Sequence, residues 1–318
     1  MAISVIRFQD NATARWGILF GDKVAMLDDA YPTTGDLLRH GQDNLRRLTP
    51  ADATLPLAQL HILSPVTGNQ QVLCQGINYG SHVRESGMDP DKIGFNTIFT
   101  KASSSMCGAQ DNIIRPAHVR LLDYEIELGL VLGCDLTGPI KAEPDNLHKF
   151  LAGVTIVNDI SARDVQLPQT QFYKGKSYRS FCPTGPVLVL LDAAEWRRWG
   201  ELRMQLSVNG VVRQDAHCGE MLFPPHKTLT ELSQVHDLFA GDLIATGTPA
   251  GCAAVAPGKA VMFIMRHFMT DSTKWRLFTK KGARNPRYLQ PGDEVVAAIS
   301  TEDSAIDLGA QRNRVVAR

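Results

Sequence analysis

The chain has 318 residues, enough for one large domain or two medium ones with a sizeable core. Hydrophobic residues make up 44% of it, and 33 basic residues balance 33 acidic ones, which gives no reason to expect a nucleic-acid or membrane partner. The first ten residues lack signal-peptide character, no apolar run approaches the ~20 residues that cross a bilayer, and six cysteines show no CxxC spacing. These features predict a cytoplasmic protein with reduced thiols, and they argue against a zinc–cysteine site.

Residues 1–65 predict a small N-terminal α+β domain. Three β-rich runs, one of them following a Gly-Asp turn, indicate strands and a hairpin at Val5–Phe8, Trp16–Phe20 and Val24–Leu27. A short helix is predicted over Thr33–His40, with a threonine near its start. Prolines then mark the exit from this domain.

Residues 66–318 predict a second domain of the mainly-β, α+β class. Short β-rich segments alternate with few long amphipathic helices, which argues against a doubly wound sheet. The strands are expected at 72–76, 125–132, 153–158, 186–191, 203–208, 242–246 and 293–299. The clearest helices are expected over Asn146–Leu151 and Leu229–Leu238.

Two acids two residues apart, Glu125 and Glu127, lie at the start of one predicted strand. Side chains at i and i+2 of a strand point the same way, so both carboxylates share one face. Adjacent carboxylates repel, and burying either one without compensation is costly. A divalent cation bound through oxygen is the simplest compensation.

A third acid, Asp159, ends the apolar strand 153–158. Together the three carboxylates form a hard oxygen site suited to Mg²⁺ or Mn²⁺. The residues after it allow a second interpretation, in which Ser161 and Asp164 are only capping groups of the next helix.

His82 and Glu85 are three positions apart, so one helical turn places them side by side. A carboxylate beside an imidazole raises its basicity, and such a dyad can deprotonate water. The alternative is an ordinary surface ion pair.

Two loops contain further candidates. Lys174 and Lys176 in a glycine-containing loop could bind an anion or stabilise an oxyanion, or form a solvated basic loop. The Gly- and Thr-rich segment 241–251 lacks the ending of a phosphate loop but can present Thr248 and backbone N–H groups to a carboxylate. It could also be a simple turn between strands.

Residues 259–287 contain eight basic side chains and one acid. A nucleic-acid-binding arm is one interpretation. Because Val261–Met265 and Trp275–Phe278 are largely apolar, we favour a packed insertion, which could lie at a subunit contact.

Taken in order, these motifs resemble the fumarylacetoacetate hydrolase family from about Val72 to the C-terminus. The matching patterns are NYxxHxxE, DYExELxxVxG, NDxSARDVQ, GKSYxxxCPxGP, GDxIxTGTPxG and PGDEV. The resemblance implies a distorted β-barrel or β-roll with a small N-terminal domain, a metal site at its mouth, and a homodimer.

The resemblance also implies roles for individual residues. The metal ligands would be Glu125, Glu127 and Asp159, and the catalytic residues would be His82, Glu85 and Lys176. The residues that bind or orient substrate would be Tyr79, Arg163, Gln166, Thr248 and Arg179. Asp123 matches no ligand position and is interpreted as a supporting residue.

The chain departs from common family patterns in three places. Arg179 stands where an aspartate is frequent, Ala102 follows Lys101 where a proline is frequent, and residues 255–285 resemble an insertion. We expect the first two departures to affect the substrate side of the site. Arg179 could pair with a distal carboxylate of a fumarylpyruvate-like diacid, or form a structural ion pair.

The resemblance implies a Mg²⁺- or Mn²⁺-dependent hydrolase acting on a carbon–carbon bond of a 2,4-dioxo acid and releasing pyruvate. Related members decarboxylate, isomerise or hydrate 2-oxo acids, including intermediates of aromatic-compound catabolism, so these reactions remain alternatives. Outside enzymes, a catalytically silent binding protein of the same fold is the remaining alternative.

Overall fold

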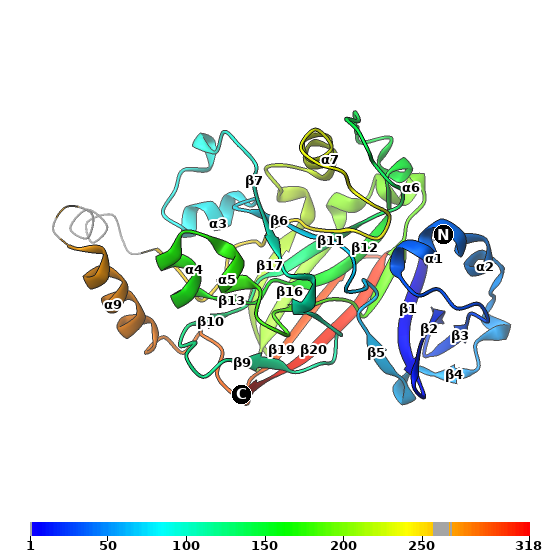
Figure 1. Ribbon diagram of the computed structural model, residues 1–318, viewed down its shortest axis with the longest axis horizontal. Coiled ribbons are helices and arrows are strands. Elements are labelled where there is room, and N and C mark those ends of the chain that lie inside the picture. The colour runs from blue at the N-terminus through cyan, green and yellow to red at the C-terminus, as the bar shows by residue number, and fades with distance from the viewer. Residues whose placement is uncertain (1, 257–266, 268) are drawn as a thin grey trace.

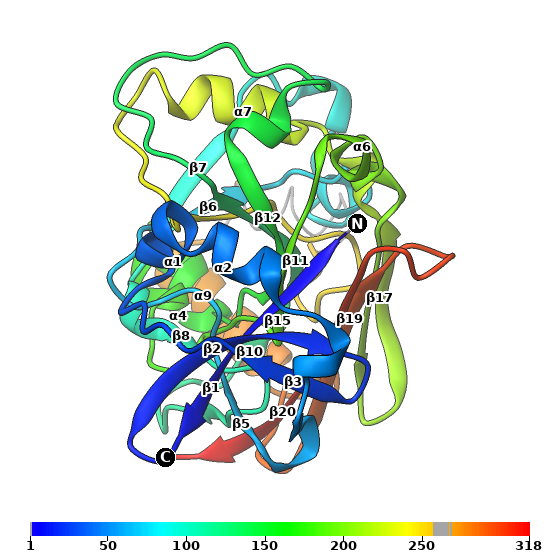
Figure 2. The same ribbon diagram turned by 90° about the vertical axis from the view of Figure 1, so that its right-hand side faces the viewer.

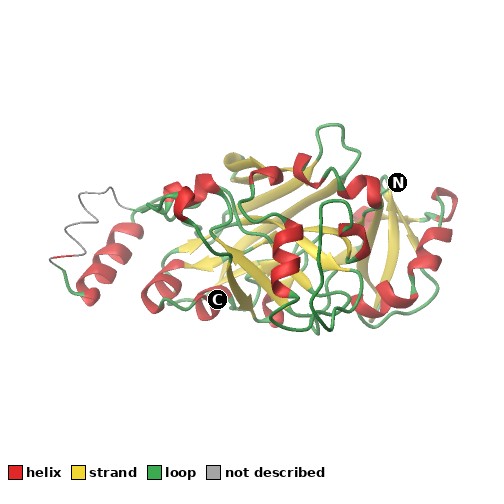
Figure 3. Cartoon of the chain, turned by 90° about the horizontal axis from the view of Figure 1, so that it is seen from above, coloured by secondary structure: helices red, strands yellow, loops and turns green. Residues whose placement is uncertain are grey.

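Strands dominate the chain, with short helices and loops around them (Figure 3). The structure, a computed structural model, describes residues 2–256, 267 and 269–318 (Figure 1). The part of the chain so described contains eight α-helices, and none of its helices is long and apolar enough to cross a membrane. The predicted mainly-β, α+β class is confirmed. The sheets form a distorted roll that is not closed into a barrel, because the strand order of the largest one is an open path.

The largest sheet has eleven strands in the order β4-β3-β2-β1-β15-β12-β11-β18-β6-β7, with β5 also paired to β1. Its strands are β1 Ile3–Asp10, β2 Thr13–Phe20, β3 Lys23–Met26, β4 Leu55–Pro56, β5 His61–Leu63, β6 Val72–Gly76, β7 Thr97–Lys101, β11 Ile126–Leu132, β12 Leu151–Asn158, β15 Val187–Leu190 and β18 Leu243–Ala245. The N-terminal strands seen in Figure 2 join this sheet through the antiparallel pairing of β1 with β15, in which Ile3 lies opposite Leu190.

A five-stranded sheet, in the order β17-β16-β19-β20-β9, packs against the large one, and two short strand pairs complete the β-structure. The five strands are β9 Ile113–Arg115, β16 Arg203–Val208, β17 Val211–His217, β19 Glu294–Ser300 and β20 Asp307–Ala317. The short pairs join β10 Leu122–Asp123 to β13 Ser161–Ala162 and β14 Cys182–Pro183 to β8 Met106–Cys107.

The helices are short and lie outside the sheets. They are α1 Thr34–His40, α2 Gln42–Arg47, α3 Gly80–Glu85, α4 Arg163–Gln169, α5 Phe172–Lys176, α6 Ala193–Trp196, α7 Pro225–Leu232 and α9 Asp271–Gly282. The predicted helix over Thr33–His40 is confirmed, since Thr33 caps α1 by accepting a hydrogen bond from the backbone N–H of Asp36.

Two helix predictions need correction. Residues Asn146–Leu151 form only a 3₁₀ turn, because Leu151 pairs with Leu132 as the first residue of β12 and ends the turn. The helix expected over Leu229–Leu238 is α7, which begins at Pro225 and ends at Leu232. A proline in the first turn of a helix loses no hydrogen bond, so it favours this earlier start.

The centre of the large sheet positions the candidate site. All seven residues of β11 are buried, as expected for a strand covered on both faces. Gly129 of β11 lies so close to β12 that an added Cβ would be 2.8 Å from Val157 Cγ2. This tight pairing fixes the beginning of β11 beside the end of β12.

Candidate active site

The three predicted metal ligands meet where β11 begins and β12 ends. Ile126 pairs with Asn158, so Glu125, just before β11, lies beside Asp159, just after β12. The backbone N–H of Asp159 donates to the carbonyl of Glu125 at 2.8 Å. One carboxylate oxygen from each of Glu125, Glu127 and Asp159 lies within 4.8 Å of the others. The antiparallel register thus brings together acids that are 34 residues apart in the sequence, counting from 125 to 159.

Three buried cations surround these acids. Lys176 Nζ lies 2.6 Å from Glu125 Oε2 and 2.5 Å from Asp159 Oδ2. Arg163 donates from Nε to Asp123 at 2.8 Å and also pairs with Glu125. Lys101 pairs with Asp159 and donates to the carbonyl of Phe181 at 2.8 Å. We call this set the charge cluster; its members are Lys101, Asp123, Glu125, Glu127, Asp159, Arg163 and Lys176.

The ion pairs shift the pKa values of their members in opposite directions. Burial alone would raise the pKa of Glu125, but Arg163 and Lys176 outweigh it and hold that pKa well below its usual range. Burial would likewise lower the pKa of Lys176, yet Asp159 and Glu125 raise it. Lys176 is therefore a charged ammonium at neutral pH.

Glu127 is the exception in the charge cluster. No described lysine or arginine forms an ion pair with it, and its carboxylate accepts a hydrogen bond from the backbone N–H of Gly247 at 2.9 Å. Burial, followed by repulsion from Asp159 and Glu125, raises its pKa well above the ordinary value. The cluster holds four carboxyl groups against three cations, so Glu127 has no positive partner among the described residues. Three carboxyl groups so close together, one of them without a cationic partner, fit the oxygen ligands of a hard divalent cation.

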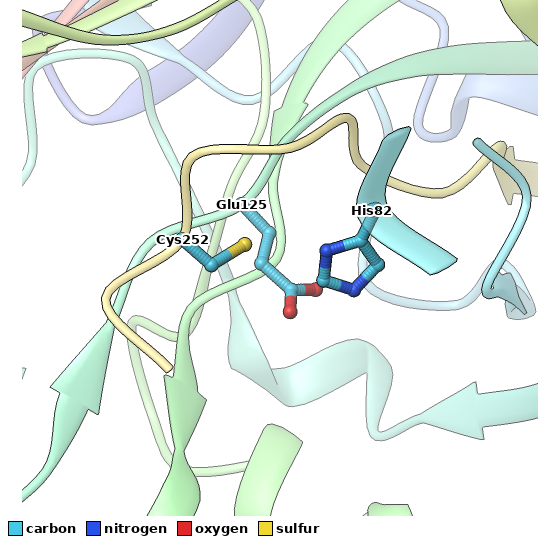
Figure 4. Close-up of side chains that lie close together, drawn as sticks. All are labelled: His82, Glu125 and Cys252. Atoms are coloured by element: carbon cyan, nitrogen blue, oxygen red, sulfur yellow. The ribbon is translucent and has the colours of Figure 1, made fainter. Parts of the chain in front are cut away.

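His82 and Glu85 share one helical turn of α3 as predicted, but no hydrogen bond joins their side chains. His82 Nδ1 is buried without a hydrogen-bond partner in the described residues. The imidazole instead points toward Glu125, with Cys252 on the other side of that glutamate (Figure 4). Burial lowers the pKa of His82, which favours the neutral base. Glu85 accepts a hydrogen bond from the backbone N–H of Gly251 at 2.8 Å.

Cys252 was not among the residues predicted from sequence. It is fully buried, and its sulfur lies within 4.8 Å of ligand atoms of His82 and Glu125, so a cysteine does stand at the site. A search for paired cysteines cannot detect it, because its neighbours are a histidine and an acid from distant segments. The nearest sequence signal was its position directly after the Gly- and Thr-rich segment 241–251.

Acidic side chains also hold the loop that covers the charge cluster. Asp123 accepts hydrogen bonds from the backbone N–H groups of Ala253 at 2.8 Å and Ala254 at 3.0 Å. Gly251 has φ +110°, and a Cβ there would be 2.0 Å from the carbonyl oxygen of Arg213. The glycine in the motif is therefore required by close backbone approach.

A pocket of about 540 Å³ opens above the charge cluster. Most of the predicted site residues line it: His82, Glu125, Glu127, Arg163, Gln166, Lys176 and Thr248. The remaining lining is largely apolar and includes Met88, Phe99, Leu167, Phe172, Trp275 and Phe278. Such a combination of a few convergent polar groups with apolar walls is typical of a small-molecule site.

Two residues predicted to bind substrate do not line this pocket. Tyr79 is fully buried in the core, where its hydroxyl lies 4.0 Å from Met204 Sδ. Arg179 is exposed and forms no ion pair with a described residue, so the structural ion pair is not found there, whereas pairing with a substrate carboxylate stays a prediction. The sequence motifs identified both residues but did not indicate where their side chains point.

Two further interpretations change with the structure. Ser161 and Asp164 do not cap α4: Ser161 donates to the carbonyl of Asp159 at 2.9 Å, and Asp164 accepts from the backbone of Arg120 at 2.8 Å. Lys101, next to the unusual Ala102, contacts Asp159 rather than the substrate side. Sequence reasoning noted that position but did not assign it to the site.

The basic stretch is described in part. Val261–Met265 lies outside the described residues, whereas Trp275–Phe278 lies on α9. No residue of α9 is fully buried, but Phe278 packs against Leu121, Ala253 and Tyr288, so this part of the stretch is packed at the surface of the protein. Lys274, Trp275 and Phe278 instead line the pocket. A role in subunit contact stays a prediction.

Comparison with known families identifies the class of protein to which this fold and its acid-rich pocket belong. The family model described as fumarylacetoacetate (FAA) hydrolase C-terminal matches residues 71–316, and one described as Rv2993c-like, N-terminal matches residues 4–65. The chain belongs to the fumarylacetoacetate hydrolase family.

Individual relatives differ in the activity that their names state. The chain is 36% identical over 225 residues, 69% of each chain, to the mitochondrial oxaloacetate tautomerase FAHD2A of Bos taurus. Among solved structures it resembles a fumarylacetoacetate hydrolase from Exiguobacterium antarcticum, with 30% identity, a TM-score of 0.75 and coverage of 99% and 100% of the two chains. It also resembles a probable 2-hydroxyhepta-2,4-diene-1,7-dioate isomerase from Mycobacterium abscessus, with 29% identity, a TM-score of 0.71 and coverage of 100% and 99%.

Proposed function

We propose that this protein is a divalent-metal-dependent hydrolase that cleaves a carbon–carbon bond of a 2,4-dioxo acid and releases pyruvate. The observation that carries the proposal is the buried Glu127 carboxyl group, which has no cationic partner among the described residues and lies beside Glu125 and Asp159. These acids are at the base of a pocket that also holds the Lys176 ammonium. A cation at that place and a proton donor next to it are what a developing enolate requires.

Glu125, Glu127 and Asp159 would hold Mg²⁺ or Mn²⁺. When bound, the metal supplies Lewis-acid stabilisation of negative charge on the keto oxygen of the substrate. The NH₂ group of Gln166 is available to orient the substrate, because its oxygen accepts from Arg163 Nη1 at 2.9 Å. The hydroxyl of Thr248 donates to the carbonyl of Ile126 at 2.9 Å. Thr248 would therefore orient the substrate through its backbone, from the Gly- and Thr-rich segment 241–251.

His82 is the proposed general base, since its imidazole lines the pocket, is favoured in the neutral form and has a free Nδ1. It would take a proton from water as the water oxygen bonds to C4 of the substrate. The C3–C4 bond then breaks, its electron pair stays with C3, and Lys176 returns a proton to C3. Glu85 supports the base indirectly, by holding Gly251 and thereby the loop beside α3.

Tautomerisation of oxaloacetate is the second candidate, because a relative with that name is 36% identical to the chain. This reaction needs no attacking water, only proton transfer between C3 and the oxygen on C2. Decarboxylation of the same acid would use the same groups. The large apolar part of the pocket favours the hydrolase, since oxaloacetate carries no apolar group to fill it.

The deciding experiment supplies metal-stripped protein with Mg²⁺ or Mn²⁺ and assays a panel of 2,4-dioxo acids and oxaloacetate. Pyruvate release from the dioxo acids supports the proposal, whereas oxaloacetate enolisation or CO₂ release alone would replace it with the second candidate. His82→Gln should lower pyruvate release about 10²–10⁴-fold while metal binding persists. Normal turnover by His82→Gln would remove its assigned role, and Glu85→Gln should have a smaller effect. A cytoplasmic location and a homodimer stay predictions.

A further inference from the structure

Helix α9 supplies part of the pocket wall, although it comes from the inserted basic stretch. Lys274, Trp275 and Phe278 line the pocket together with residues of the charge cluster. In Figure 1, α9 lies at the opposite end of the molecule from the N-terminal strands and next to α4, with which it is in contact. The inserted segment therefore brings its own side chains to the site where substrate is proposed to bind.

The C-terminal half of α9 is fixed to the body of the protein. Phe278 packs against a small cluster formed by Leu121, Ala253 and Tyr288. Gly282 lies so close that an added Cβ would be 2.8 Å from Leu121 Cδ1. Just after the helix, Asn285 Nδ2 donates to the carbonyl of Ala253 at 3.1 Å. Because Asp123 holds the N–H of that alanine, α9 is tied to the charge cluster.

The face that α9 turns to the pocket is aromatic. Trp275 and Phe278 are three residues apart, so they share one side of the helix, and their rings meet edge to face with centroids 5.9 Å apart. Lys274 also lines the pocket, but its Nζ pairs with Asp271 at 2.9 Å. This local pair offsets the positive charge nearest to the aromatic rings, and the wall presented by α9 is mainly apolar.

A second aromatic pair lies nearer the charge cluster. Phe99 and Phe172 meet edge to face with centroids 5.2 Å apart, and Lys176 Nζ is 5.2 Å from the centre of the Phe99 ring. Leu167 of α4 and Met88 add further apolar lining. Aromatic and aliphatic surface thus extends from the proposed proton donor to α9.

We propose that Trp275 and Phe278 form, with this inner apolar lining, a subsite for the acyl group attached to C4 of the substrate. The preferred substrate class would be 2,4-dioxo acids whose acyl group is bulky, uncharged and aromatic. This inference rests on the proposed function: the carboxylate and keto oxygens of the pyruvate half lie at the charge cluster, so the acyl half extends along the apolar wall.

The test compares 2,4-dioxo-4-phenylbutanoate with 2,4-dioxopentanoate, which differ only in a phenyl or methyl group on C4. The wild-type protein should have the larger kcat/KM for the phenyl compound. Trp275→Ala should lower the ratio of the two kcat/KM values about tenfold or more, since an apolar pocket discriminates by the area it buries. Leu277→Ala is the matched control: it lies on α9, is 41% exposed and does not line the pocket, so the ratio should stay unchanged.

A binding measurement separates failure of the subsite from failure of the proposed reaction. Calorimetry with 2-oxo-4-phenylbutanoate and 2-oxobutanoate, in the presence of Mg²⁺, requires no cleavage. The phenyl compound should bind more tightly, and Trp275→Ala should remove most of that preference. Equal loss for both acids, or no loss for either, would overturn the subsite. Cleavage of neither dioxo acid together with a retained phenyl preference would overturn the hydrolase and leave the subsite.

Discussion

The charge cluster and α9 border the same pocket but are held in different ways. Members of the cluster are between 0% and 5% exposed, and all of them except Glu127 form ion pairs within the cluster. In contrast, α9 has no buried residue and is attached mainly through its C-terminal half. Buried charges tolerate little displacement because each one depends on its partner. An exposed helix can change its side chains at small cost. The comparison suggests that the reaction is set by the cluster and the substrate preference by α9.

The largest effect is expected from Glu127→Gln. Because no cation of the described residues pairs with this carboxylate, the change removes no such partner and the protein should fold normally. The loss of a metal ligand should lower turnover about a thousandfold or more, which corresponds to ~4 kcal/mol. Metal content after dialysis and pyruvate release measure the two effects. Full activity with normal metal content would show that Glu127 is not a ligand.

Lys101→Met should instead act on stability. The change leaves Asp159 with one buried cation fewer, and breaking such a pair typically costs ~3–5 kcal/mol. Chemical denaturation should show this as a lower free energy of unfolding. Lys141→Met, which removes an exposed ion pair with Glu143, is the control and should leave the unfolding curve nearly unchanged. Identical curves for the two variants would contradict the structural role of Lys101.

Gly251→Ala tests the loop that is hydrogen-bonded both to Asp123 of the charge cluster and to Asn285, just after α9. The positive φ costs ~1–3 kcal/mol for a non-glycine residue, and the 2.0 Å approach to Arg213 forces the loop to move. We expect a lower melting temperature together with weaker turnover. Gly138→Ala, at a position with open space around its Cβ, should change neither property. A Gly251→Ala protein with wild-type melting and turnover would show that the loop does not constrain the site.

The smallest effect is expected from Leu277→Ala. This side chain is 41% exposed on α9 and outside the pocket, so the free energy of unfolding should change by less than ~0.5 kcal/mol. Thermal melting and the substrate ratio described above should both match those of the wild type. A clear loss of stability would mean that this face of α9 is covered, for example at a contact with a second subunit.

Local patterns predicted the strands better than the short helices. The predicted strands 72–76 and 203–208 coincide with β6 and β16, because alternation and β-branched residues are local signals. The helix predicted over Asn146–Leu151 was wrong because Leu151 pairs with Leu132 of β11, a contact between residues far apart in the sequence. Tertiary context decided that segment against its local preference.

The acids of the site could be predicted, but most of their partners could not. The spacing of Glu125 and Glu127 indicated a shared face from three residues of sequence. Lys101, in contrast, pairs with Asp159 across 58 residues, and no periodic pattern reports such a contact. The assignment of Tyr79 failed because a motif fixes a position in the chain, whereas the core determines where a large ring points.

The central claim is that Glu125, Glu127 and Asp159 hold a divalent cation that the reaction requires. It is tested most directly by pyruvate release from a 2,4-dioxo acid, measured with chelator-treated wild type and Glu127→Gln before and after adding Mg²⁺ or Mn²⁺. We predict no release from either protein before metal is added, and recovery in the wild type alone. Equal release with and without chelator, or full recovery of Glu127→Gln, would contradict the claim.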